Sequence, residues 1–91
     1  MEKAFVVRVK GRVTGIGFRY SAIMAAEKFP TLKGYVKNIS HSEVEAFIQG
    51  EEKDLEGMVQ WLAKGPPMAK VYDISVNPAG IDPSLTDFGV R

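Results

Sequence analysis

Residues 11–19, with the sequence GRVTGIGFR, hold the pattern in this chain best suited to chemistry. Its three glycines permit positive φ angles and let a ligand approach the backbone closely. Successive amides in such a turn can point inward and form an anion-binding nest, and a helix N-terminus adds unpaired N–H groups. The planar guanidinium of Arg19 matches two phosphate oxygens, which a lysine cannot do. We therefore predict that this loop binds a phosphate-like anion.

The same residues also fit a purely structural turn, in which Phe18 is buried and Arg19 is solvated. The spacing alone does not separate these two interpretations. Two familiar phosphate-binding patterns are excluded, however. No Gly-Lys-Ser/Thr follows the glycines, as a Walker loop requires, and the GxGxxG fingerprint of dinucleotide sites is absent.

The charges are divided unevenly along the chain. Residues 1–38 carry eight basic and two acidic side chains, whereas residues 39–91 carry four basic and nine acidic ones. A basic half raises the local concentration of an anionic ligand, which agrees with the predicted loop. A charged surface can also divide unevenly by chance, so the asymmetry supports an anion site without establishing one.

The length of 91 residues predicts a single domain, residues 1–91. Without cysteine, and with one histidine, the chain has neither disulfides nor thiolate-bound zinc, so we expect no metal and no cofactor. The apolar runs are too short to span a membrane, and the N-terminus lacks the apolar core of a signal peptide. A cytoplasmic location is therefore expected.

The elements that must position the loop follow from hydrophobic periodicity. Alternation predicts strands at residues 5–10, 33–39, 43–49, 71–76 and 88–91, with a turn-rich loop at 77–83. Helical spacing predicts helices over about residues 19–29 and 51–64, which end at Pro30 and Gly65. The order β-α-β-β-α-β predicts an α+β, ferredoxin-like sandwich with two helices on one face of an antiparallel sheet.

The loop resembles the signature of the acylphosphatase family, and GYVKN at residues 34–38 is similar to that family's second motif. The two motifs lie nineteen residues apart when measured from Arg19 to Asn38. The resemblance continues through nearly the whole chain, in the family's order and spacing. It includes VEAFIQG at 44–50, WLAKGPPMAKV at 61–71 and DFGVR at 87–91.

The resemblance implies metal-independent hydrolysis of the carboxyl–phosphate bond of a small-molecule acylphosphate, giving a carboxylate and inorganic phosphate. It implies that Arg19 binds the phosphate together with the loop backbone, and that Asn38 orients the attacking water. The backbone residues concerned are Gly15, Ile16, Gly17 and Phe18. A carboxylate is a good leaving group, so positioning and charge stabilisation are the main catalytic requirements. Losing one preorganised donor typically raises such a barrier by about 3–4 kcal/mol.

Two positions differ from the family pattern. Thr14 stands where the family usually has Gln, and His41-Ser42 stands where Asp-Gly is common. Asp-Gly favours tight turns with positive φ, so we expect the hairpin after Asn38 to differ in shape.

We also expect a monomer, with inorganic phosphate as product or inhibitor, and no nucleic-acid or membrane partner.

Other residues and two other functions also fit parts of the sequence. His41 could act as a base but more readily fits a solvated turn, and Trp61 or Tyr35 could stack on a ligand or simply pack. Tyr20 could contact the acyl group or pack at the helix start. RNA-recognition domains share the same element order, but their RNP1 motif belongs on the third strand, whereas KGYVKN falls on the second. A regulatory ferredoxin-like domain that binds without turnover is the third alternative.

Overall fold

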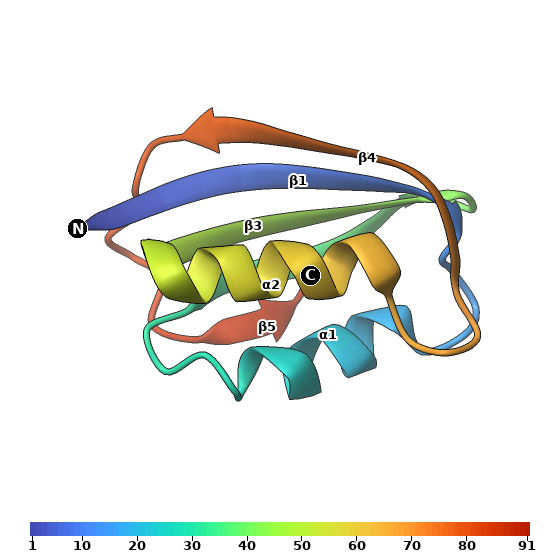
Figure 1. Ribbon diagram of the computed structural model, residues 1–91, viewed down its shortest axis with the longest axis horizontal. Coiled ribbons are helices and arrows are strands. Elements are labelled where there is room, and N and C mark those ends of the chain that lie inside the picture. Colours follow the sequence, from blue (N-terminus) through green and yellow to red (C-terminus); the bar gives the residue numbers. More distant parts are fainter.

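A computed structural model describes residues 1–91 (Figure 1). The elements, in chain order, are β1 (Glu2–Arg12), α1 (Phe18–Ala26), β2 (Lys33–Ser40), β3 (Glu43–Glu51), α2 (Glu52–Lys64), β4 (Lys70–Ala79) and β5 (Phe88–Val90). Each predicted element is present in the predicted order. Neither helix is long and apolar enough to cross a membrane.

The five strands form one sheet in the order β4-β1-β3-β2-β5. β3 lies at the centre and pairs antiparallel with β1 and β2, and β4 pairs antiparallel with the other side of β1. Figure 1 shows both helices on the same side of this sheet. The ferredoxin-like prediction is thus confirmed, and the tail adds one detail: β5 runs parallel to β2, which makes the complete sheet mixed.

The hydrophobic core lies between the helices and the sheet. The sheet contributes alternate residues of β1 and β3, which are fully buried because successive side chains point to opposite faces. The alanines of α1 let that helix approach the sheet closely, and α2 contributes a longer apolar stripe. The buried helix residues are Phe18, Ala22, Ala25, Ala26, Leu55, Met58 and Leu62.

Several boundaries differ from their prediction by a few residues, and strand β1 continues to Arg12, into the predicted anion-binding loop. Two of the other differences have clear physical reasons. Helix α1 ends at Ala26 because residues 27–29 form tighter i→i−3 hydrogen bonds, such as Phe29 N to Ala26 O at 3.0 Å, ahead of Pro30. Strand β4 continues through Pro78 to Ala79, into the segment that was predicted to be a loop. Proline is tolerated there because β4 is an edge strand and needs no amide on its open side.

Gly57 lies inside α2, where glycine is unfavourable, and its contact with Phe29 explains it. An ideal Cβ at this position of α2 would lie 2.4 Å from Cε1 of the Phe29 ring. The glycine therefore lets the ring of Phe29 pack directly against the helix backbone. This packing offsets the loss of helix propensity, which is up to about 1 kcal/mol relative to alanine.

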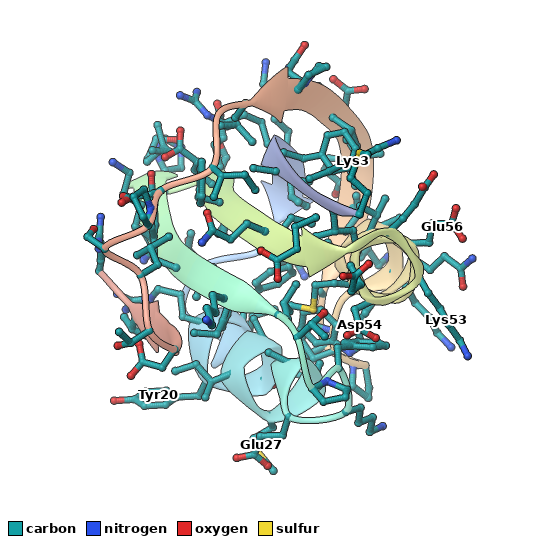
Figure 2. The ribbon with its side chains drawn as sticks, turned by 90° about the vertical axis from the view of Figure 1, so that its left-hand side faces the viewer. Lys3, Tyr20, Glu27, Lys53, Asp54 and Glu56 are labelled. Atoms are coloured by element: carbon teal, nitrogen blue, oxygen red, sulfur yellow. The ribbon has the colours of Figure 1, made fainter.

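The first turn of α2 carries Asp54, which is labelled in Figure 2 and accepts hydrogen bonds from the hydroxyl and the amide of Thr31. These bonds, the hydroxyl first, lower the pKa of Asp54 below its ordinary value of 3.8. A depressed folded-state pKa contributes stability above the unfolded value, and that stability is lost as the pH falls through the folded value. We expect Asp54→Asn to be less stable than wild type at neutral pH, with the difference shrinking below pH 3.8. Urea denaturation at several pH values measures this, and a constant difference would contradict it.

Candidate active site

The loop between β1 and α1 is shaped by two glycines in the left-handed region. Gly15 has a φ of 73° and Gly17, at the N-terminal boundary of α1, has a φ of 76°. An ideal Cβ at either position would meet no atom within 4 Å, so the backbone conformation, not space, calls for glycine. Any other residue would cost about 1–2 kcal/mol in this conformation. The loop backbone is therefore specified by its sequence.

The amides of this loop are free to bind a ligand. The first amide of α1 to find a backbone acceptor is Ser21 N, which donates to Gly17 O at 2.9 Å. The amides of residues 15–20 donate to no protein acceptor. The helix also has no side-chain cap at Gly17 and no acidic residue in its first turn. Free N–H groups at the positive end of a helix dipole are suited to bind an anion.

Arg19 lies in this same first turn and is half-buried. A cation near the positive end of a helix dipole is unfavourable, so the position does not serve stability. No carboxylate forms a salt bridge with Arg19, although the chain makes five other such pairs. An anionic ligand would compensate both the free amides and this unpaired guanidinium.

A pocket of about 150 Å³ brings the loop together with Asn38. Its lining residues are Val13, Thr14, Gly15, Gly17, Phe18, Arg19, Tyr20 and Asn38. The two residues predicted to act on the substrate, Arg19 and Asn38, therefore face one cavity. Among the predicted backbone residues, only Ile16 is absent from the lining, and its side chain packs against the core.

Asn38 is near the end of β2, where the pairing with β3 is irregular. Asn38 pairs with Val44 and Ser40 pairs with Glu43, so Ile39 is an extra residue in the ladder. Such bulges bend a strand and re-aim neighbouring side chains. The Asn38 side chain is exposed and forms no hydrogen bond within the protein, so its amide is available to solvent and ligand. The hairpin turn at His41-Ser42 has no positive φ, so it differs from an Asp-Gly turn, as predicted.

Three pocket residues were not part of the predicted site: Val13, Thr14 and Tyr20. The hydroxyl of Thr14 donates a hydrogen bond to the backbone carbonyl of His41, in the hairpin after Asn38. Tyr20 is 73% exposed and projects away from the body of the molecule (Figure 2). The signal for all three was their position within or directly after the glycine-rich motif.

The remaining candidates lie outside this pocket. His41 is exposed at the hairpin tip, and only its carbonyl is engaged. Trp61 packs against Phe18, with ring centroids 5.5 Å apart, in agreement with a packing role. A larger groove of about 510 Å³ runs along α1 beside Trp61 and Pro66, but it shares no residue with the pocket that holds Arg19.

The open face of the sheet does not resemble an RNA-binding surface. Its aromatic residues Tyr35 and Phe47 stack on each other at 5.7 Å, and the Arg91 guanidinium covers the Tyr35 ring at 4.3 Å. Beside them, the carboxylate of Glu45 is bound by Arg8 at 2.8 Å. Base stacking needs free aromatic rings, and these two rings already contact each other and Arg91.

Known proteins with this sequence pattern point to one family. The model of the family Acylphosphatase matches residues 5–90. An acylphosphatase from an Anaeromyxobacter strain is 35% identical over 85 residues, which cover 93% of this chain and 90% of that protein. An acylphosphatase from Paraburkholderia xenovorans is 38% identical over 73 residues, covering 80% of this chain and 74% of that protein.

Solved structures agree with the sequence matches. An acylphosphatase from Coxiella burnetii superposes with a TM-score of 0.91 at 37% identity and covers 99% of this chain and 93% of its own. An acylphosphatase from Bacillus subtilis superposes with a TM-score of 0.89 at 36% identity, over 100% of this chain and 99% of its own. Sequence and fold therefore agree over the full length of the match, and this chain belongs to the acylphosphatase family of hydrolases.

Proposed function

We propose that the pocket hydrolyses acylphosphates by in-line attack of a water molecule on a phosphoryl group held by Arg19 and the loop amides. In this proposal Asn38 orients the water. The observation that carries the proposal is the meeting of the free amides, the unpaired Arg19 and the unpaired Asn38 side chain in one pocket of about 150 Å³. No divalent metal takes part.

The phosphoryl oxygens are the groups that this pocket binds. The amides around Gly15, Ile16, Gly17 and Phe18 donate to them, and the Arg19 guanidinium adds two parallel donors and a positive charge. Charge on these oxygens is redistributed in the transition state, and donors that are already oriented stabilise it without reorganisation. The glycines hold the amides in this orientation before substrate arrives.

The attacking water needs orientation more than it needs a strong base. The Asn38 carbonyl oxygen accepts one hydrogen of the water and directs a lone pair toward phosphorus. None of the eight residues that line the pocket is Asp, Glu or His, so no side chain there is suited to remove a proton. We therefore assign the water's second proton to a phosphoryl oxygen of the substrate itself.

The leaving group departs without an acid. The bond between phosphorus and the acyl oxygen breaks as the bond to the water oxygen forms, and the bonding electrons leave with the carboxylate. A carboxylate is stable at neutral pH, so protonation of the leaving oxygen is unnecessary. The products are a free carboxylate and inorganic phosphate, and phosphate fits the same cradle as a competitive inhibitor.

Benzoyl phosphate turnover tests this proposal. The purified protein should release inorganic phosphate from benzoyl phosphate far faster than the spontaneous reaction, and EDTA should leave the rate unchanged. A rate equal to spontaneous hydrolysis would overturn the proposed function, and a rate abolished by EDTA would overturn its metal independence.

The monomeric state and the cytoplasmic location stay predictions, which sedimentation and cell fractionation would check.

A further inference from the structure

We propose that Thr14 is a positioning residue that holds the β2–β3 hairpin against the anion-binding loop and thereby places Asn38 relative to the phosphoryl group. The inference rests on the proposed function, because it assigns a role to the distance between two parts of that site. Figure 1 shows the β1–α1 loop and the β2–β3 hairpin at the same end of the sheet.

Two hydrogen bonds join the hairpin to residues 11–14, at the end of β1 and the start of the loop. The Thr14 hydroxyl donates to the carbonyl of His41, which lies 27 residues away in the sequence. The amide of Gly11 donates to the carbonyl of Ser42 at 2.9 Å. The two bonds therefore engage both residues of the hairpin turn. Only the first bond involves a side chain, so a substitution at Thr14 can remove it while the backbone bond of Gly11 stays.

The backbone of Asn38 is paired with Val44 in β3, but the placement of its side chain depends on the segment that follows it. Its side chain is exposed and has no hydrogen-bond partner in the protein, and the bulge at Ile39 interrupts the ladder between Asn38 and the turn. Within the turn itself, Ser40 Oγ accepts only a local bond from Ser42 N, at 3.2 Å. The bond from Thr14 is thus the side-chain link between the segment that follows Asn38 and the loop that carries Arg19.

Thr14 also lines the pocket, so a direct role in phosphate binding is the competing interpretation. A hydroxyl has one hydrogen to donate, and here it is directed to the His41 carbonyl. The side that remains for a ligand carries only lone pairs, which repel phosphoryl oxygens. The hydroxyl is therefore suited to position the hairpin and unsuited to bind the anion.

The test compares Thr14→Val with Thr14→Ser in the benzoyl phosphate assay. Thr14→Val keeps the side-chain shape but removes the hydroxyl, and we expect kcat to fall about tenfold, the size of effect that one lost hydrogen bond produces. The inhibition constant of inorganic phosphate should change by less than about twofold, since no donor to the phosphate is lost. Thr14→Ser should restore kcat. Ser84→Ala is the matched control, since its hydroxyl bonds to Asp82 at 2.6 Å, outside the pocket, and it should behave as wild type.

A double-mutant cycle with Asn38→Ala decides whether Thr14 acts through Asn38. If it does, Thr14→Val should add no further loss in the Asn38→Ala background, because the group that it positions is gone. Additive losses, a weaker phosphate affinity in Thr14→Val, or an unchanged kcat would each overturn the inference. An Asn38→Ala variant with full activity would instead overturn the proposed role of Asn38. If Thr14→Val does not fold, Thr14→Ala removes the same hydroxyl for the same comparisons.

Discussion

Replacing Arg19 with alanine is expected to lower kcat/KM for benzoyl phosphate by at least about 1,000-fold. Removing one preorganised donor from such a site typically costs 100- to 1,000-fold, and Arg19 supplies two donors together with the only positive charge among the residues that line the pocket. Inhibition by inorganic phosphate should be lost in parallel, because the same donors hold the product. Steady-state kinetics with phosphate as a competitor measures both effects.

Although the Arg19→Ala variant should lose activity, it should be more stable than wild type. Arg19 is a cation in the first turn of α1 and has no carboxylate partner, so its removal relieves an unfavourable interaction with the helix dipole. The expected gain in the free energy of unfolding is about 0.3–1 kcal/mol at low ionic strength, measured by denaturant unfolding without phosphate. A variant that is both inactive and unstable would indicate a structural arginine.

Two further variants make the assignment of Arg19 specific. Arg19→Lys keeps the charge but loses the planar fork, so its activity should fall between those of wild type and Arg19→Ala. Arg12→Ala is the matched control, because Arg12 belongs to the same motif but is exposed and does not line the pocket. We expect it to keep nearly full activity. Equal losses from Arg12→Ala and Arg19→Ala would point to a general effect of basic charge.

The fold was largely predictable because its elements follow simple periodicities. The buried residues Val7 and Val9 of β1 alternate with outward-facing residues, and the core residues of α2 recur at helical spacing, so local pattern and tertiary packing agree. The errors occur where packing overrides the local signal. Pro78 looks like a strand breaker, but it is accommodated at the open edge of β4. The parallel pairing of β5 with β2 joins segments distant in sequence, which no periodicity encodes.

The site was predictable to the extent that it lies within contiguous motifs. Gly15, Gly17 and Arg19 share one loop, and the resemblance of the second motif pointed to Asn38. The bond from Thr14 to His41 was not predictable, because it depends on where the β2–β3 hairpin meets the loop in space. The bulge at Ile39 was missed for a similar reason, since it appears only in the register of β2 against β3.

Replacing Asn38 with alanine is expected to lower kcat about 100-fold while leaving the inhibition constant of phosphate nearly unchanged. Orientation of the water matters only when the new bond forms, so its loss affects the transition state and not the binding of the phosphoryl group. Phosphate affinity therefore distinguishes the two variants: Arg19→Ala should lose it, and Asn38→Ala should keep it. Asn77→Ala, an exposed asparagine on β4 outside the pocket, is the matched control and should be fully active.

Asn38→Asp separates orientation of the water from removal of its proton. If the reaction needed a base at this position, a carboxylate would supply one and activity would be retained or raised. In the proposed mechanism the proton goes to the substrate, so the new carboxylate only adds negative charge beside the phosphoryl oxygens. We then expect a lower kcat together with a weaker phosphate affinity, unlike Asn38→Ala. An Asn38→Asp variant more active than wild type would contradict substrate-assisted proton transfer and would support general-base catalysis instead.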